Sequence, residues 1–295
     1  MSESIKEQRW QDFVSNTTVN VHNSGFVRLV DVMPGNIPQE AIDNGTLADY
    51  AICQSARVSY GDGTKKVNTD IGLIRYLMRN RHTSPFEMVE LKFHIKAPIF
   101  IVRQWLRHRT ASVNEISGRY SIMKDEFFEP EKLCKQSTGN RQGRGEEVDP
   151  EDDLVGIFAE YLGGDSAKKS YEEYKKLIDG GVARETARIG LPLSLMSEFY
   201  WKVNLHNLYH FLSLRMDAHA QEEIRDFASV IFDMVSQICP VSSQAFKDYR
   251  LNSITLSGIE IEAIKNGGKL NTENKRETQE YNEKLKILNL FQQDE

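Results

Sequence analysis

Residues 103–120 concentrate charged side chains that could bind an anion. The stretch contains four arginines and a single acid, Glu115. If it begins as a helix, Arg103 and Arg107 lie one turn apart on the same face, where their like charges repel. An external anion would relieve this repulsion, and the planar guanidinium group suits phosphate and the edges of planar heterocycles. His108 adds a side chain that titrates near neutral pH.

The same stretch also has a purely structural interpretation. Arginines at the end of a helix can simply meet the C-terminal dipole and solvent. The sequence Ser112-Val-Asn-Glu115 matches a capping box, which would give both of its end residues a structural role. From the residues alone, these arginines are equally consistent with an anion-binding site and with a cluster that is solvated or lies in a subunit interface.

A second group of polar side chains lies in the second half of the chain. Arg184 and Arg188 are an i, i+4 pair before Leu191-Pro192. Farther on, a predicted helix with an apolar opposite face carries Asn204, His206, His210 and Arg215. Asn204 is as well suited to be the N-cap of this helix as to be a ligand. This second group of polar side chains favours a binding site, but helix capping explains part of it equally well.

The histidines and the arginine of this helix have their own alternatives. His206 and His210 have a spacing that can bind zinc, but no third ligand stands at a familiar spacing, so no metal is expected. Arg215 should lie near the apolar face and needs a partner there, for which Asp217 is the nearest candidate.

The segment before the first predicted strand is accounted for by helix capping. Ser84 is expected as the N-cap and Glu87 at the third helical position, with Pro85 in the first turn. Nothing in the chain matches a nucleophile elbow, and no cysteine stands in a cationic sequence context. The residue types thus predict a binder of a planar anionic ligand whose chemistry uses no obvious protein nucleophile.

The elements that must position these residues show in the hydrophobic pattern. Residues 89–96 and 195–203 alternate as half-buried strands, and each is followed by a predicted helix, over 99–108 and 205–212. Residues 170–179 predict a helix closed by Gly180-Gly181, and residues 219–238 a long helix before Pro240. Few strands and several long helices predict an α+β fold with a mixed or antiparallel sheet. Its glycine-rich segments lack dinucleotide-loop spacing, so no Rossmann fold is expected.

Composition narrows the class of protein. The chain has 295 residues, a net charge of -6 and ordinary globular composition. An acidic balance argues against a general nucleic-acid binder, and no apolar run is long enough to cross a membrane. The three cysteines, Cys53, Cys134 and Cys239, are odd in number and widely spaced, which suits a reducing compartment. A cytoplasmic protein is expected.

The domain organisation is expected to be simple. Residues 1–250 are interpreted as one catalytic domain, with an insertion or surface loop at 135–165 whose most polar part is 135–153. Residues 251–295 are a C-terminal extension. Its last part should form a helix with an apolar face made by Tyr281, Leu285, Leu288 and Phe291.

At this point the chain resembles a known family. Arg107-His108-Arg109, seven further residues and then Ser117 resemble the signature of the flavin-dependent thymidylate synthases. The similarity covers residues 24–246. Further matching segments include Ala97-Pro98-Ile99-Phe100, His82 with Pro85-Phe86-Glu87, Trp201 to Asn204, and the run from Leu214 to Gln221. So many matches in order are far more specific than a lone Arg-His-Arg.

The resemblance implies an FAD-dependent enzyme that transfers a methylene group from methylenetetrahydrofolate to C5 of dUMP, with NADPH reducing the flavin. It implies a homotetramer whose active sites draw on several subunits. The residues that it assigns to the flavin are Ser84, Glu87, Arg107, His108, Arg109, Glu115, Asn204, His206 and His210. Those that it assigns to dUMP are Gln104, Trp105, Leu106, Arg107, Glu115, Ile116, Ser117, Gly118, Arg119, Arg188 and Arg215. Folate contacts are assigned to His82 and Tyr120.

Among these residues, the resemblance points to Arg215 as the catalytic group and to Ser117 as a residue that orients the substrate. The chain departs from some relatives at Met88, His206 and His210, so flavin contacts there could differ in kind. The alternative function is a non-catalytic nucleotide-binding protein of the same fold.

Overall fold

The computed structural model describes residues 17–58, 70–138, 143–161 and 165–290. The chain forms two compact units, Met1–Phe246 and Lys247–Glu295. The boundary expected after residue 250 lies inside η4 (Lys247–Leu251), one turn beyond that division. None of the helices in the described ranges is long and apolar enough to cross a membrane.

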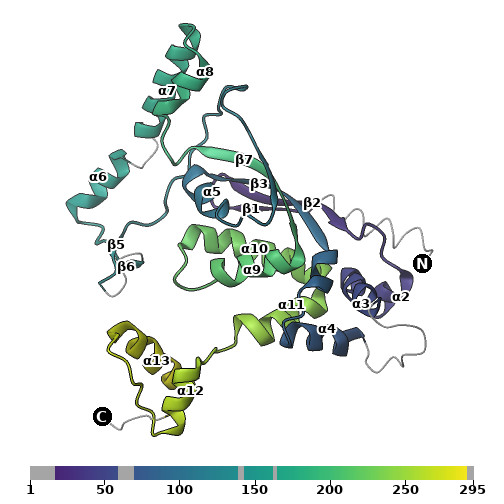
Figure 1. The fold of residues 1–295 in the computed structure, drawn as a ribbon. Helices are drawn as coiled ribbons and strands as arrows, with labels where there is room; N and C mark the ends of the chain where they lie inside the picture. The colour runs from purple at the N-terminus through teal and green to yellow at the C-terminus, as the bar shows by residue number, and fades with distance from the viewer. Residues whose placement is uncertain (1–16, 59–69, 139–142, 162–164, 291–295) are drawn as a thin grey trace. The chain divides into compact units, whose positions relative to one another are not determined.

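A five-stranded antiparallel sheet is the centre of the first unit (Figure 1). Its strands, in spatial order, are β1 (Thr18–Val21), β2 (Gly25–Met33), β3 (Glu90–Pro98), β7 (Met196–Asn204) and β4 (Ser112–Glu115). The two strands predicted from alternation, β3 and β7, lie side by side at its centre, with Phe93 opposite Trp201. The antiparallel sheet and its helices confirm the α+β prediction.

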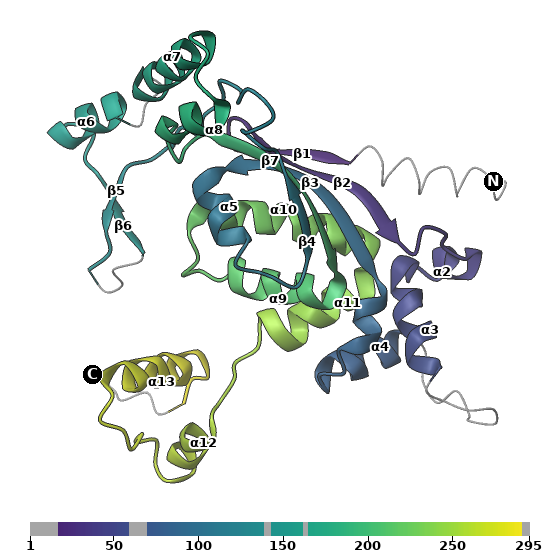
Figure 2. The ribbon, with the colours of Figure 1, turned by 45° about the horizontal axis from the view of Figure 1, so that its top comes forward.

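One face of the sheet forms the core with three helices. Figures 1 and 2 show α5 (Ile99–Trp105), α9 (Leu205–Arg215) and α10 (Glu222–Ile238) on the same side of the strands. The fully buried Trp105 ring packs there against Trp201 and Phe211, with ring centroids 5.3 and 4.9 Å away. Burial of these large aromatic side chains stabilises the packing of the predicted pair β3 and α5 against the predicted pair β7 and α9.

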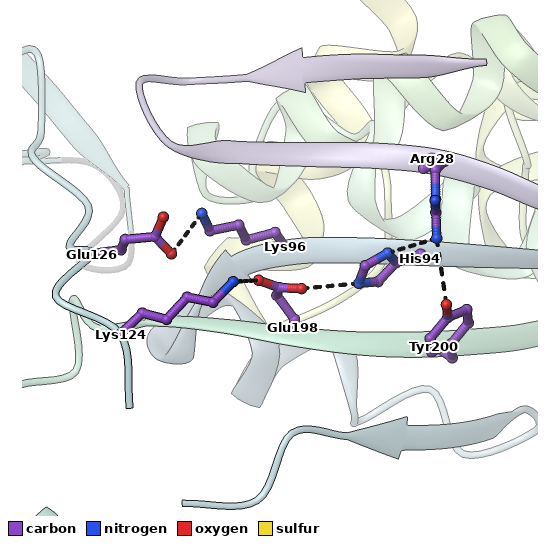
Figure 3. Close-up of polar contacts among 7 residues, drawn as sticks. All are labelled: Arg28, His94, Lys96, Lys124, Glu126, Glu198 and Tyr200. Carbon is purple, nitrogen blue, oxygen red and sulfur yellow. Dashed lines mark hydrogen bonds and ion pairs between the residues drawn. The ribbon is translucent and has the colours of Figure 1, made fainter. Parts of the chain in front are cut away.

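The opposite face of the sheet carries polar side chains (Figure 3). His94 lies between Arg28 and Glu198, with ring nitrogens 3.1 Å from Arg28 Nη2 and 3.1 Å from Glu198 Oε2. Lys124 donates to Glu198, and the Tyr200 ring stacks on His94 at 4.8 Å. The period of two along β3 and β7 thus separates an apolar face, which meets the helices, from this polar one.

The first unit contains further elements outside this sheet and its three helices. In chain order they are α2 (Gln39–Asp43), η1 (Leu47–Asp49), α3 (Tyr50–Arg57), α4 (Asp70–Arg79), η2 (Ser84–Met88), β5 (Cys134–Gln136), β6 (Arg144–Glu147), α6 (Asp153–Tyr161), α7 (Asp165–Asp179), α8 (Arg184–Ala187), η3 (Arg188–Gly190) and α11 (Pro240–Phe246). The helix predicted to end at Gly180-Gly181 is confirmed as α7, and Gly181 has a φ of +86°, which favours glycine.

Several local predictions are wrong at the ends of elements. The helix after β3 stops at Trp105 instead of residue 108, so Arg107 lies beyond it and does not share a helix face with Arg103. Ser84 is the first residue of η2, not its N-cap; Thr83 precedes it without a side-chain capping bond. The long helix begins at Glu222 instead of residue 219. Helix ends depend on tertiary contacts that the hydrophobic pattern does not record.

Two larger corrections concern sheet structure. Ser112–Glu115 is an edge strand paired with β7, not a capping box, because the edge of β7 supplies a ladder of backbone partners. The polar region 135–165 is not simply a loop. It contains the two-stranded β5–β6 sheet and α6 in its described parts.

The second unit is a pair of helices, α12 (Gly258–Lys265) and α13 (Lys275–Ile287). Buried Ala263, Leu270, Tyr281 and Leu285 pack together between them. The predicted apolar face is thus confirmed at Tyr281 and Leu285. Leu288 is 38% exposed and does not join it, and Phe291 lies outside the described residues.

Asp49 is a fully buried acid where η1 meets α11. Its Oδ2 accepts hydrogen bonds from the backbone N–H groups of Val241 and Ser242, at 2.7 and 3.1 Å. Burial nevertheless raises the pKa of Asp49 to about 7, because the low-polarity surroundings disfavour the charged form more than these bonds favour it.

We expect the stability of the wild-type protein to fall, relative to an Asp49→Asn variant, as the pH rises from about 5 to about 8. An unfolded aspartate has a pKa of about 3.9, so over this range the folded state holds a proton that the unfolded state has lost. Raising the pH therefore favours unfolding, by about 2–3 kcal/mol in all. Thermal unfolding of both proteins across this pH range tests it, and parallel stability curves would contradict it.

Candidate active site

A cavity of about 330 Å³ lies where the loop after α5 meets α9 and β7. Its described lining contains three arginines, Arg107, Arg109 and Arg215, and no acidic residue. His108, Asn207 and His210 add polar groups, and Trp201, Val203 and Leu214 add apolar ones. A cavity lined by cations and flanked by aromatic and aliphatic surface suits a planar anionic ligand.

Local sequence explains why these side chains converge. After Trp105, the main chain makes a tight turn in which His108 N–H donates to the Trp105 carbonyl. The chain then continues into β4 at the sheet edge, so Arg107 and Arg109 stay at the end of α5. On the facing helix α9, Asn207 and His210 are three residues apart and face the same cavity.

Arg215 and His108 form the central polar contact of the cavity. Arg215 Nε donates to His108 Nε2 at 3.0 Å, and its Nη2 lies 3.5 Å from the carbonyl oxygen of Gln104. Burial, and then the positive charge of Arg215, lower the pKa of His108 to about 4. The ring is therefore neutral at physiological pH and can accept this hydrogen bond.

Asp217 is not the partner of Arg215, contrary to the sequence-based prediction. Its carboxylate instead accepts from the backbone N–H and lies 2.8 Å from the ring Nδ1 of His219. Within the described ranges, Arg215 forms no ion pair with a carboxylate. Burial, and then the charge of Arg107, lower the pKa of Arg215, but an arginine remains charged at any working pH.

Three further residues assigned to the substrate, Gln104, Trp105 and Leu106, lie in or next to α5 and differ in their surroundings. The side-chain amide of Gln104 donates to Gln221 Oε1, which ties α5 to the start of α10. The Trp105 side chain is fully buried in the core, so only its main chain could reach a ligand. Leu106, half-buried, is the C-cap of α5.

A second cluster of assigned residues lies at the other end of β4. It contains Ile116, Ser117, Gly118, Arg119, Tyr120 and Arg188. Gly118 is so close to Arg188 that a Cβ at this position would lie 3.0 Å from Arg188 Cδ. Arg119 forms an exposed ion pair with Glu185 at 3.2 Å, and Arg184 donates to the Tyr120 carbonyl. The Tyr120 side chain is 76% exposed.

The strand β4 separates this second cluster from the cavity. Its four residues, Ser112–Glu115, span about 13 Å at the usual rise along a strand. Glu115, assigned to both ligands, accepts a hydrogen bond from Ser197 Oγ at 2.5 Å. One chain therefore gathers Arg107, His108, Arg109, His210 and Arg215 in one place, but keeps Ser117–Arg119 and Arg188 in another.

The other residues assigned to flavin and folate do not line the cavity. Ser84 and Glu87 belong to η2, which contacts α9. Exposed His82 lies with its ring edge-on to Tyr76, at 5.7 Å. His206 is half-buried on α9. Asn204 is confirmed as an N-cap, since its side chain accepts from the Asn207 N–H at 2.9 Å.

Asn207 is the lining residue that sequence reasoning missed. Its Nδ2 also donates to Asn204 Oδ1 at 2.9 Å, which fixes the side chain at the start of α9. The helical spacing could have identified Asn207, because it stands one turn before His210 and lies on the same face of the helix.

Comparisons with known proteins match most of the length of the chain. A family model described as thymidylate synthase complementing protein matches residues 42–241. A flavin-dependent thymidylate synthase of Dictyostelium discoideum is 54% identical over 272 residues, covering 92% of this chain and 87% of that protein. One from Treponema denticola is 49% identical, covering 90% of this chain and 96% of that protein.

A solved structure has a fold similar to that of this chain. A UMP/dUMP methylase from Streptomyces cacaoi, bound with 5-Br UMP, is 34% identical and superposes with a TM-score of 0.64. The match covers 79% of this chain and 98% of the methylase. Because the family model and these relatives match most of its length, the chain belongs to the family of flavin-dependent thymidylate synthases.

Proposed function

We propose that the chain catalyses the reductive methylation of dUMP to dTMP, with FAD as cofactor, methylenetetrahydrofolate as carbon donor and NADPH as reductant. Membership of the family makes it a flavin-dependent methyltransferase. The observation that carries the proposal is the cavity itself, where Arg107, Arg109 and Arg215 meet without an acidic residue among the described lining. Arg107 and Arg109 are exposed and Arg215 is half-buried, so their side chains can reach a common anionic ligand in the cavity.

The residues of the cavity fit a flavin nucleotide. Arg107 and Arg109 can bind its phosphates, and the side chains of Asn207, His210 and the neutral His108 can form hydrogen bonds with the polar edge of a ring system. The volume of about 330 Å³ is at the lower end for a small-molecule pocket, so one chain can hold only part of a dinucleotide. Bound FAD would supply the reducing equivalents that no side chain of the protein can supply.

Arg215 is the proposed catalytic residue. Its guanidinium lies in the cavity wall and keeps its positive charge, so it can stabilise the uracil ring as N3 loses its proton. The negative charge then raises the electron density at C5, the carbon that must attack the methylene group. Ser117 and Arg119 would orient the nucleotide.

The cysteines support a route without a thiolate nucleophile. Cys53 and Cys239 are both fully buried, and burial raises the pKa of Cys53 to about 12 and that of Cys239 well above its usual value. Half-buried Cys134 lies in β5 and is not part of the cavity lining. A thiol that stays protonated is a poor nucleophile.

The active enzyme is proposed to be a homotetramer with shared active sites. The support is the separation of the two clusters by β4, since dUMP and flavin need residues from both. A second copy can present its Ser117–Arg119 segment to the cavity of the first. As part of the same proposal, residues 1–250 are the catalytic domain, residues 251–295 are an extension, and the enzyme is cytoplasmic.

One visible absorption spectrum of the purified protein, recorded with and without dUMP, tests the function. We expect a flavin spectrum that changes when dUMP binds, and dUMP-dependent release of tritium from C5-labelled dUMP. UMP serves as the comparison nucleotide. A protein that stays colourless and inactive after FAD is added back contradicts the proposal. Thermal stabilisation by dUMP without dTMP formation would indicate the non-catalytic binding protein instead.

A further inference from the structure

His108 is an unusual partner for Arg215, a half-buried arginine that would more often pair with a carboxylate. Arg215 Nε donates to its Nε2 at 3.0 Å, so the ring must carry its proton on Nδ1. The second acceptor of Arg215, the Gln104 carbonyl, is also neutral. In the part of the chain that the structure describes, no carboxylate pairs with this guanidinium.

The packing around His108 fixes the ring in this orientation. Its ring meets the buried Phe211 edge-on, with centroids 4.9 Å apart, and lies 6.1 Å from His210. The ring therefore cannot turn away from Arg215 without losing contact with the core. The pKa of about 4 for His108 agrees with this geometry, because burial and the charge of Arg215 both disfavour a second proton.

The charge of the partner matters for the reaction. A carboxylate in place of the imidazole would hold the guanidinium as firmly, but its negative charge would cancel much of the field that Arg215 exerts on the substrate. A neutral acceptor orients the guanidinium and leaves its whole charge for the anionic uracil ring.

We propose that His108 is a positioning residue that holds Arg215 as a neutral hydrogen-bond acceptor, so that the full guanidinium charge stabilises the N3 anion of dUMP. This role rests on the proposed function of Arg215 and is separate from the flavin contact assigned to His108 by resemblance. The proposal predicts that full activity requires a hydrogen-bond acceptor at position 108 and that this acceptor must be uncharged.

Three substitutions at His108 separate these requirements. His108→Gln keeps a neutral acceptor of similar reach, His108→Leu removes the acceptor, and His108→Glu keeps an acceptor but adds a negative charge. We expect His108→Gln to stay within about threefold of wild type. His108→Leu and His108→Glu should each lower kcat by about tenfold to a hundredfold. The KM for dUMP should change little, because the lost interaction is strong only when the ring is anionic.

Controls separate this role from a flavin contact. Rates are expressed per bound flavin, measured by visible absorption of each holoenzyme. His219→Gln, at a 78% exposed histidine side chain outside the cavity lining, should leave kcat unchanged. In an Arg215→Ala background, His108→Leu should cost nothing further, since a residue that acts through Arg215 has no effect without it. An additional loss in the double variant would overturn the proposal.

A spectroscopic measurement makes the test independent of turnover. The ultraviolet spectrum of 5-fluoro-dUMP reports ionisation of its N3, which fluorine makes more acidic. Wild type and His108→Gln should lower the N3 pKa of the bound analogue by similar amounts, whereas His108→Leu and His108→Glu should lower it less. If no variant differs from wild type, the proposal is wrong. If wild type lowers this pKa but forms no dTMP, the proposed function fails and the role of His108 stands.

Discussion

Arg215→Ala is expected to lower kcat for dTMP formation by about a thousandfold. The proposed role of the guanidinium is to stabilise the uracil anion directly, and alanine has no charge or hydrogen-bond donor to replace it. Its hydrogen bonds to His108 and the Gln104 carbonyl show that it is oriented before substrate binds. Tritium release from C5-labelled dUMP measures the loss.

Arg215→Lys refines this result. Lysine keeps a positive charge but cannot reproduce the planar fork, so we expect activity between those of the wild type and the alanine variant. Arg276→Ala is the matched control, because the Arg276 side chain is 85% exposed and its Nε donates to Glu280 one turn farther along α13. It should leave kcat unchanged. Size-exclusion chromatography checks the rival role of Arg215 as an interface residue: dissociation of the alanine variant would favour that role, and an intact oligomer the catalytic one.

Activity is expected to return when two inactive variants are assembled together. Arg119→Ala damages the Ser117–Arg119 cluster, and Arg215→Ala damages the cavity at the other end of β4. If each active site combines the cavity of one copy with the Ser117–Arg119 segment of another, mixed oligomers contain some sites with neither substitution. With random assembly of equal amounts, about a quarter of the sites are intact.

The measurement is dUMP turnover after co-expression of the two variants, or after unfolding and refolding their mixture. Each variant refolded alone is the first control. A mixture of Arg215→Ala and His108→Leu is the second, since both substitutions damage the same cluster and no intact site can form. A mixture of Arg119→Ala with Arg215→Ala that stays as inactive as its components would show that one chain supplies both clusters.

Much of the central fold was determined by local sequence pattern. The alternation along residues 89–96 and 195–203 gave β3 and β7 within two residues at each end, because one face must be apolar to meet the helices. Asn204 could be predicted as the N-cap of α9 since its short side chain satisfies a free N–H there. The order and spacing of Arg107, His108, Arg109 and Ser117 were enough to indicate the family.

Tertiary structure alone decided how the site is assembled. The partner of Arg215 is His108, which is 107 residues away in the sequence, and not the nearby Asp217. No periodicity records such a contact, because it depends on how α9 packs against the end of α5. For the same reason Ser112–Glu115 became an edge strand: long-range pairing with β7 outweighed a local capping pattern.

Residues 103–120 show the division most clearly. Their sequence determined which side chains could bind an anion, since residue type fixes charge and hydrogen-bonding geometry. The fold decided that Trp105 belongs to the core and that β4 holds Arg107–Arg109 and Ser117–Arg119 at opposite ends. A strand is extended, so residues close in sequence lie at opposite ends of β4, while Arg215 and His108, far apart in sequence, are in contact.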